Sequence, residues 1–223
     1  MRRIAGWIVI LSVPIVLTMV IVRLLTFPWF PAFEYGRASF PTDPYGFTKE
    51  ERLRLARATI TFLNVPGPTD VLTTLSLSDG TPAYNERELG HMDDVKRVYS
   101  GLTVAAVVCL AAGGAAVWYL SDLHGADTAW WDLATGARVT LALLVALGLW
   151  MLVGFDRFFT LFHGVFFQPG TWLFYTSDTL IRLFPMQLWQ DAGLLVAGGV
   201  TLLALVLYFV SRAITRRLET GAA

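Results

Sequence analysis

Four long stretches of apolar residues without a charged side chain dominate the pattern of this chain. They are about 19, 23, 17 and 20 residues long, close to the roughly 20 residues that an α-helix needs to cross the hydrocarbon core of a bilayer. The stretches are Ile4 to Val22, Val98 to Leu120, Val139 to Phe155 and Ala192 to Ser211. The pattern therefore predicts an integral membrane protein, a single membrane domain over residues 1–223, with spans at about 4–26, 98–120, 138–156 and 192–212.

Basic residues near the two ends of the chain predict its orientation. Arginines precede the first span and follow the last, at Arg2, Arg3, Arg212, Arg216 and Arg217. Because Lys and Arg are enriched on the cytoplasmic side, both termini are expected in the cytoplasm. Lys96 and Arg97 at the second span oppose this assignment, but their segment is longer than the loops that obey the charge rule. Residues 27–97 and 157–191 are then extracytoplasmic.

The first outer segment contains the signature of a helix. Thr48 followed by Glu51 is a capping box, and the apolar positions after it predict a helix to about Asn64. Its basic positions are Arg52, Arg54 and Arg57. This helix is expected to lie on the outer face of the membrane. The alternative is that its arginines bind anionic lipid headgroups.

A short hairpin and a second helix are predicted after it. Residues 71–77 are rich in β-branched side chains and roughly alternate, and the turn signal at 78–80 leads to a return strand at 81–84. Asn85 and Glu88 then form a second capping box, whose helix is expected to run on into the second span.

The second outer segment predicts further helices at the interface. Asp178 is expected to cap a short amphipathic helix that runs to Phe184 and ends before Pro185. The predicted fold class is therefore an all-α integral membrane protein. It comprises a four-helix transmembrane bundle, a small extracytoplasmic α+β subdomain (helix plus hairpin) from the first outer loop, and interfacial helices in the second.

Two histidines lie just outside the spans, on the same predicted side. His91 shares a helix face with Glu88 and Asp94, and a neighbouring carboxylate can fix its tautomer and raise its basicity. His163 lies among aromatic residues, seven positions after Asp156. Both arrangements suit general acid–base catalysis. The structural alternatives are a solvated polar collar around His91 and a snorkelling interfacial ring at His163.

Composition excludes several other classes of protein. The 17 basic and 17 acidic residues cancel, so no net field attracts nucleic acid. The single cysteine, Cys109, lies within a span and cannot form a disulfide within the chain.

His124 falls in the predicted inner loop, on the opposite side from the other two histidines. No phosphate-binding loop, serine-nucleophile elbow or metal-ligand spacing occurs in the sequence.

Two strings resemble the boxes of a bacterial four-span membrane family, the lipoprotein intramolecular transacylases. They are ERELGHMDDVK at residues 86–96 and FDRFFTLFHGVFF at residues 155–167, the second followed by GTWLF at 170–174. The resemblance covers the chain from its first span to its last. It implies transfer of the sn-2 acyl chain of a diacylglyceryl-modified lipoprotein to the α-amino group of that lipoprotein's N-terminal cysteine, giving the lyso form.

The resemblance also implies roles for particular residues. His163 is expected to act as base and His91 as its partner in proton transfer; the reverse order is the alternative. The expected supporting groups are the orienting carboxylates Glu88, Asp94 and Asp156, and the cations Arg87 and Lys96, which could hold the developing charge. The substrate is expected to contact Trp172, Phe162 and Phe166. No metal or cofactor is expected, the partners are the lipoprotein and membrane phospholipid, and the site lies at the outer leaflet of the bacterial cytoplasmic membrane.

Other functions fit parts of this pattern. A non-enzymatic membrane scaffold or sensor that binds a lipid or protein on its outer face would tolerate loss of both outer imidazoles. Haem ligation by the histidines would require them within the spans, facing each other. Metal-dependent hydrolysis would require distant carboxylates as further ligands.

Overall fold

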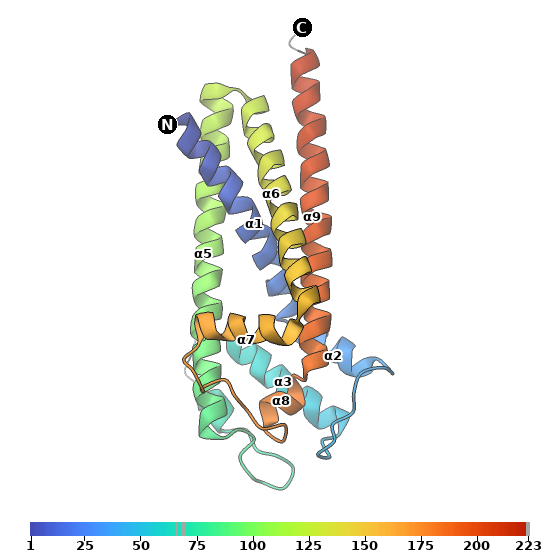
Figure 1. Ribbon diagram of the computed structural model, residues 1–223. Helices are drawn as coiled ribbons and strands as arrows, with labels where there is room; N and C mark the ends of the chain where they lie inside the picture. Colours follow the sequence, from blue (N-terminus) through green and yellow to red (C-terminus); the bar gives the residue numbers. More distant parts are fainter. Residues whose placement is uncertain (66, 68–69, 222–223) are drawn as a thin grey trace. The chain divides into compact units, whose positions relative to one another are not determined.

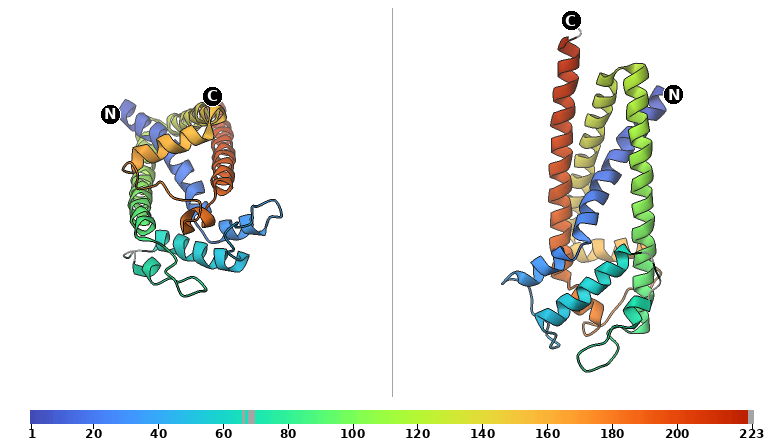
Figure 2. Two further views of the ribbon diagram at one scale, coloured as in Figure 1. Left: turned by 60° about the horizontal axis from the view of Figure 1, so that its bottom comes forward. Right: turned by 180° about the vertical axis from the view of Figure 1, so that it is seen from behind.

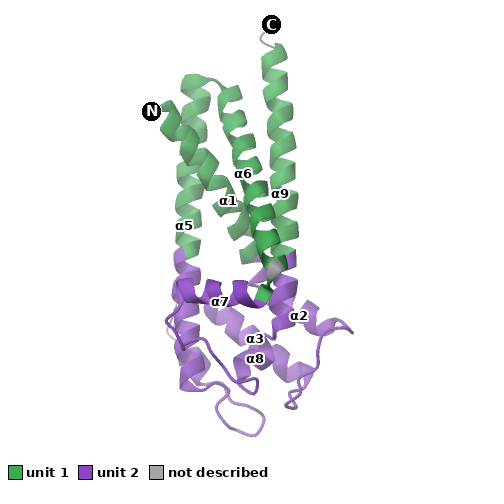
Figure 3. Ribbon diagram, in the orientation of Figure 1, with its two compact units in different colours: residues 1–22, 102–155, 195–223 green, residues 23–101, 156–194 purple. Residues whose placement is uncertain are grey.

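The computed structural model describes residues 1–65, 67 and 70–221 as an almost entirely helical chain (Figure 1). Over these residues the helices are α1 (Arg2–Leu25), α2 (Trp29–Gly36), α3 (Lys49–Asn64), α4 (Asp70–Thr73), α5 (Glu86–His124), α6 (Ala126–Val153), α7 (Phe155–Phe166), α8 (Thr179–Leu183) and α9 (Met186–Gly221). By length and composition, α1, α5, α6 and α9 can each cross a membrane. The predicted helical fold with four candidate membrane-spanning helices is therefore confirmed, but the predicted α+β subdomain is not. The chain divides into two compact units (Figure 3).

The first unit, residues 1–22, 102–155 and 195–223, contains the apolar lengths of the four long helices, which Figure 2 shows from two further directions. Small residues let these helices approach closely. A Cβ added at Gly136 would lie 2.7 Å from a methyl carbon of Val13, and one added at Gly113 would lie 3.1 Å from the Cβ of Ser12. Such contacts are typical of helices that associate in lipid, where burying apolar surface provides no driving force.

The turn between α5 and α6 is shorter than the sequence suggests. The stretch from 121 to 138 reads as an inner loop because it is polar, but α5 continues to His124 and α6 already begins at Ala126. Gly125 alone separates them, with φ +93°, a conformation that favours glycine. Polar residues at the membrane boundary therefore extend both helices instead of forming a loop.

The second unit, residues 23–101 and 156–194, holds both outer histidines and has a hydrophobic core of its own. Helix α3 contacts α2, α4 and α8, and the contact between α3 and α8 can be followed in Figure 2. The core side chains are Leu55, Phe62, Leu72, Ala83, Tyr84, Met92, Leu180 and Leu183. Burial of this apolar cluster holds the segments between the long helices in a defined fold.

Thr48 caps α3 as predicted, although the Glu51 carboxylate accepts a hydrogen bond from the Ser78 amide at 3.1 Å, and the second predicted capping box is complete. Thr48 Oγ1 accepts a hydrogen bond from the Glu51 amide at 3.1 Å, which starts α3. Asn85 and Glu88 bond reciprocally: the Glu88 amide donates to Asn85 Oδ1 at 3.0 Å, and the Asn85 amide donates to Glu88 Oε2 at 2.9 Å. Each cap satisfies an amide that a helix start leaves without a partner.

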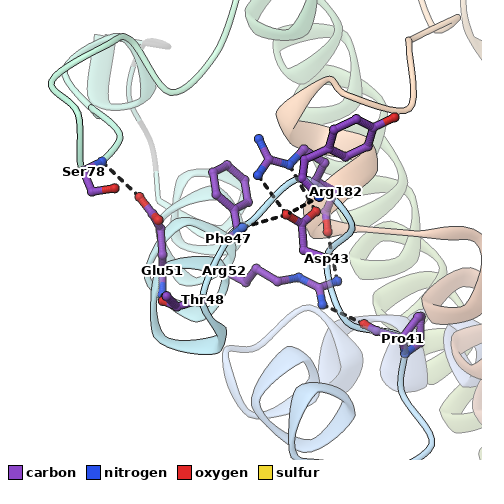
Figure 4. A network of polar contacts seen from close by, with 9 residues as sticks. Pro41, Asp43, Phe47, Thr48, Glu51, Arg52, Ser78 and Arg182 are labelled. Carbon is purple, nitrogen blue, oxygen red and sulfur yellow. Dashed lines mark hydrogen bonds and ion pairs between the residues drawn. The ribbon is translucent and has the colours of Figure 1, made fainter.

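A buried ion pair joins the loop before α3 to helix α8 (Figure 4). Arg182 donates to both oxygens of Asp43, at 3.1 and 2.8 Å, and its guanidinium lies 3.2 Å from the centre of the Phe47 ring. Arg52 donates to the carbonyl oxygens of Pro41 and Arg182 at 2.8 and 2.9 Å. Hydrogen bonds in a planar, bidentate arrangement are the strong form of the arginine–carboxylate pair.

The predicted hairpin is wrong, and the described residues contain no strand. Residues 70–73 form helix α4, whose turns are closed by Thr73 and Thr74 hydroxyls that donate to the carbonyls of Asp70 and Val71. The chain does reverse at the predicted turn, but pairing is limited to one antiparallel bridge between Ser76 and Pro82. The bridge is closed by two hydrogen bonds of 2.8 Å on either side of it, from the Leu77 amide to the Thr81 carbonyl and from the Ala83 amide to the Leu75 carbonyl.

Candidate active site

The two outer histidines lie next to each other in the second unit. His91 is on the first part of α5, seven residues before the apolar stretch that begins at Val98, and His163 is on α7. Their ring centroids are 6.3 Å apart and the ring planes differ by 22°. Although His91 and His163 are 72 residues apart in the sequence, their rings are close enough for one substrate group to bridge them.

Aromatic rings surround this pair. The His163 ring lies 4.1 Å from the ring of Phe159 and 4.8 Å from that of Trp172, measured between centroids. The His91 ring makes edge contacts with Phe167 at 4.9 Å and Phe174 at 5.3 Å. Phe167 also contacts His163, at 5.5 Å. These side chains shield His91 and part of His163 from water, which lowers the local dielectric.

One hydrogen bond fixes the tautomer of His163. Its Nδ1 lies 2.8 Å from the carbonyl oxygen of Phe159, four residues earlier on α7. A carbonyl oxygen only accepts, so Nδ1 carries the hydrogen and Nε2 carries the lone pair. The ring therefore presents an unprotonated nitrogen, the form required of a general base.

His91 is more deeply placed. It retains 9% of its accessible surface, and its Nδ1 is buried without a hydrogen-bond partner among the described residues. A buried polar nitrogen without a partner is costly in a folded protein, and such groups are commonly found at functional sites.

Burial keeps both imidazoles neutral near pH 7. Burial, with a smaller contribution from the nearby His163, lowers the pKa of His91 from 6.5 to about 4, while Asp94 acts in the opposite direction. Burial also lowers the pKa of His163, and the hydrogen bond to the Phe159 carbonyl partly offsets this. Neutral imidazoles can accept a proton, so this electrostatic environment supports a base.

The three predicted orienting carboxylates are placed differently from one another. Both oxygens of Glu88 accept backbone hydrogen bonds, from the amides of Asn85 and of Leu180, the latter at 2.7 Å. Asp94 pairs with Arg97 and reaches His91 through its charge. Asp156 is exposed in the first turn of α7. The group that bonds His163 Nδ1 is the Phe159 carbonyl and not the Asp156 carboxylate. Glu88 thus joins α5 to the start of α8.

The two predicted cations are both engaged with other groups. Arg87 donates to Asp178 at 2.8 Å, and its guanidinium lies 5.5 Å from the centre of the Phe174 ring. Lys96 donates to the carbonyl oxygen of Gly67 at 2.8 Å, and its ammonium lies 4.0 Å from the centre of the Phe62 ring. Arg87 and His91 both contact the ring of Phe174, whereas Lys96 bonds the main chain that follows α3.

The predicted substrate-contacting side chains lie around His163. Trp172 and Phe162 contact its ring, Phe162 at 5.6 Å between centroids, and Phe166 stacks on Phe162 at 5.0 Å. Phe162 and Phe166 remain exposed, as do Leu161 and Val165 on the same helix. An exposed apolar surface next to the imidazoles suits a substrate that carries acyl chains.

Sequence reasoning missed the Phe159 carbonyl and the rings of Phe167 and Phe174. The first could have been foreseen, because a helical side chain can bond the carbonyl four residues earlier. The other two depend on how the segment after α7 folds back, for which the sequence carries no local signal.

The third histidine belongs to the other unit. His124 ends α5, and its ring contacts Tyr119 at 5.6 Å between centroids. Across the described ranges, no group of three or more His, Cys, Asp or Glu side chains is arranged to hold a metal ion.

Comparison with known proteins identifies the family. The profile described as "Lipoprotein intramolecular transacylase Lit" matches residues 6–189. A protein of Aquifex aeolicus (strain VF5), described as uncharacterized, is 34% identical over 197 residues, which cover 88% of each chain. In fold, the chain resembles the in meso structure of the integral membrane lipoprotein intramolecular transacylase Lit from Bacillus cereus. The TM-score is 0.83 at 20% identity, covering 99% of this chain and 98% of that one.

Two further structures of the Bacillus cereus protein, in which one histidine is replaced by arginine or by alanine, each give a TM-score of 0.77 at 19% identity. They cover 99% of this chain and 95% and 96% of those chains.

The fold and the paired imidazoles define an integral membrane protein whose second unit carries candidate acid–base chemistry. The chain belongs to the lipoprotein intramolecular transacylase (Lit) family. It is therefore an acyltransferase of the bacterial membrane that acts on lipoproteins.

Proposed function

We propose that the chain moves the sn-2 acyl chain of a diacylglyceryl lipoprotein onto the α-amino group of the lipoprotein's N-terminal cysteine. The observation that carries the mechanism is the free Nε2 of His163 next to His91 within an aromatic cluster. The amine attacks the ester carbonyl carbon, a C–N bond forms and the ester C–O bond breaks. An amide and a glyceryl hydroxyl result, with no oxidant, reductant or water consumed.

Each imidazole has a separate task in this scheme. His163 Nε2 takes the proton that the attacking amine must lose, and the Phe159 carbonyl stabilises the resulting imidazolium through Nδ1–H. The proton then passes by way of His91 to the departing glyceryl oxygen. An imidazolium whose pKa is about 4 gives up its proton readily, which suits His91 to the second transfer.

Holding amine and ester on one molecule supplies a further part of the rate. Intramolecular reactions of well-oriented groups gain large effective concentrations, so the protein need not form a covalent acyl intermediate. The exposed aromatic and aliphatic side chains of α7 would hold the acyl chain beside His163. We place both termini in the cytoplasm and this site at the outer leaflet, where a lipoprotein's acyl chains are anchored.

A substrate whose two acyl chains differ in mass can show which ester supplies the transferred chain. A synthetic diacylglyceryl-cysteine lipopeptide would carry a deuterated acyl chain at sn-2 and an unlabelled one at sn-1. We expect the deuterium label on the N-terminal amide of the product, read by tandem mass spectrometry, because the sn-2 ester is the group that reacts. Label retained on glycerol, with the unlabelled chain on nitrogen, would show that the sn-1 ester reacts instead.

The pH dependence of the transfer follows from the lowered pKa of His163. The α-amino group of the substrate must be neutral to attack, so the logarithm of the rate should fall with a slope of about one below a pKa of about 8. Below the pKa of His163, which lies under 6.5, protonation also removes the base and the slope should rise to about two. Single-turnover rates between about pH 4.5 and 9 would show both breaks. A change of slope from one to two above pH 7 would contradict the assignment of the second break to His163.

A further inference from the structure

The proposed reaction needs a hydrogen-bond donor for the ester oxygen, and the predicted cations do not supply it. As the amine attacks, negative charge develops on the carbonyl oxygen, and a preorganised donor at that position is commonly a large contribution to catalysis. Lys96 is bonded to the Gly67 carbonyl, and Arg87 is paired with Asp178. The donor must therefore come from another group near His163.

The indole of Trp172 has an unused donor in the right neighbourhood. Its Nε1 is buried and has no hydrogen-bond partner in the described part of the chain. The Trp172 ring lies 4.8 Å from the ring of His163, with an angle of 37° between the planes. Burying an N–H without a partner costs free energy, because the hydrogen bond to water is lost and none replaces it.

The chemistry of this group restricts what can satisfy it. An indole N–H donates and cannot accept, so its partner must be an acceptor such as a carbonyl oxygen. The ring of His91, which also has a buried and unpartnered nitrogen, contacts His163 as well. Trp172 and His91 each have a buried nitrogen without a hydrogen-bond partner, and both rings contact His163. Such an arrangement is expected of a site in which a polar substrate supplies the missing hydrogen bonds.

The Trp172 side chain is partly exposed, although its Nε1 is buried. It lies between α7 and α8 in a segment outside any helix, and its neighbours Leu173 and Tyr175 are exposed. A small displacement of this segment can open the indole N–H to an ester held at His163, and catalytic hydrogen bonds commonly tighten only when the substrate is bound.

We propose that the Trp172 Nε1–H donates a hydrogen bond to the carbonyl oxygen of the transferred acyl ester and to the oxyanion formed from it. This proposal rests on the proposed function. The amine nitrogen adds to the carbonyl carbon, and the C=O π pair moves onto the oxygen that Trp172 holds. The pair returns when the bond to the glyceryl oxygen breaks, so the indole keeps its hydrogen throughout.

The test is to remove the N–H while keeping an aromatic side chain. Trp172→Phe and a variant with benzothienylalanine at position 172, in which sulfur replaces the N–H in a ring of the same shape, would be compared with wild type. The readout is transfer on a diacylglyceryl-cysteine lipopeptide in detergent. We expect kcat to fall about 100-fold in both variants. KM should change by less than about threefold, since the donor acts mainly in the transition state.

Trp118→Phe serves as the matched control, because Trp118 is exposed on α5 in the other unit; it should keep the wild-type rate. The pH profile of both Trp172 variants should keep the break assigned to His163. A benzothienyl variant with the wild-type kcat would overturn the proposal, as would a slow variant whose pH break moves, which would show that Trp172 acts by positioning His163. If wild type itself transfers no acyl chain, the proposed function fails instead.

Discussion

Replacing His163 by alanine is expected to slow acyl transfer by about 10²- to 10⁴-fold, the usual contribution of a positioned general base. The Nδ1–H of His163 bonds the Phe159 carbonyl, so the other nitrogen is committed to proton acceptance. Without it, the attacking amine loses the base whose accepting nitrogen the Phe159 carbonyl fixes. Purified protein and a synthetic lipopeptide, followed by mass spectrometry over time, would give the rate.

Two controls make this result specific to the base. His124→Ala removes an imidazole that contacts Tyr119 in the other unit and should keep the wild-type rate. Free imidazole added to His163→Ala should restore part of the activity, since the truncated side chain leaves space among the rings of Phe159 and Trp172. A rate within about threefold of wild type would remove His163 from the mechanism.

Loss of the buried ion pair should have the largest effect on stability. In Arg182→Leu the carboxylate of Asp43, fully buried in the wild type, would lose both side-chain hydrogen bonds from Arg182. Removing one partner of a buried pair typically costs about 3–5 kcal/mol, because the other charge is left without compensation. The hydrogen bond from Arg52 to the carbonyl oxygen of residue 182 is to the main chain, so the substitution leaves this acceptor in place (Figure 4). Thermal unfolding in detergent should show a markedly lower midpoint.

The exposed pair between Arg97 and Asp94 provides the comparison. Arg97 is 77% exposed, and water already solvates its charge, so Arg97→Leu should leave the midpoint unchanged. Arg182→Lys should recover part of the loss by restoring the charge without the bidentate geometry. Equal midpoints for Arg182→Leu and Arg97→Leu would show that the Asp43 pair does not hold this unit together.

Local signals in the sequence predicted most of the fold. Length and apolar composition suffice for the four long helices, because lipid leaves few alternatives to a helix. The capping pairs Thr48–Glu51 and Asn85–Glu88 are set by contacts three residues apart, so they too could be recognised. The hairpin prediction failed because β-propensity reflects packing against neighbouring strands, and here Leu72 packs into a helical core.

The candidate site was only partly predictable. The sequence identified both histidines as chemically suitable, but their approach to 6.3 Å depends on the packing of α7 and the segment after it. Sequence spacing suggested that Glu88 could orient His91, yet the buried start of α8 has an amide at Leu180 that Glu88 satisfies. Long-range contacts of this kind decide how a side chain is used, and spacing along one helix cannot reveal them.

The central claim is that the two outer imidazoles carry out the acyl transfer. Its most direct test is mass spectrometry of a lipoprotein's N-terminal peptide from cells that express this chain at matched levels. We predict that wild type and His124→Ala convert diacylglyceryl-cysteine to the N-acyl lyso form, and that His91→Ala and His163→Ala do not. Undiminished lyso product from both outer variants would contradict the claim and favour a membrane scaffold or sensor.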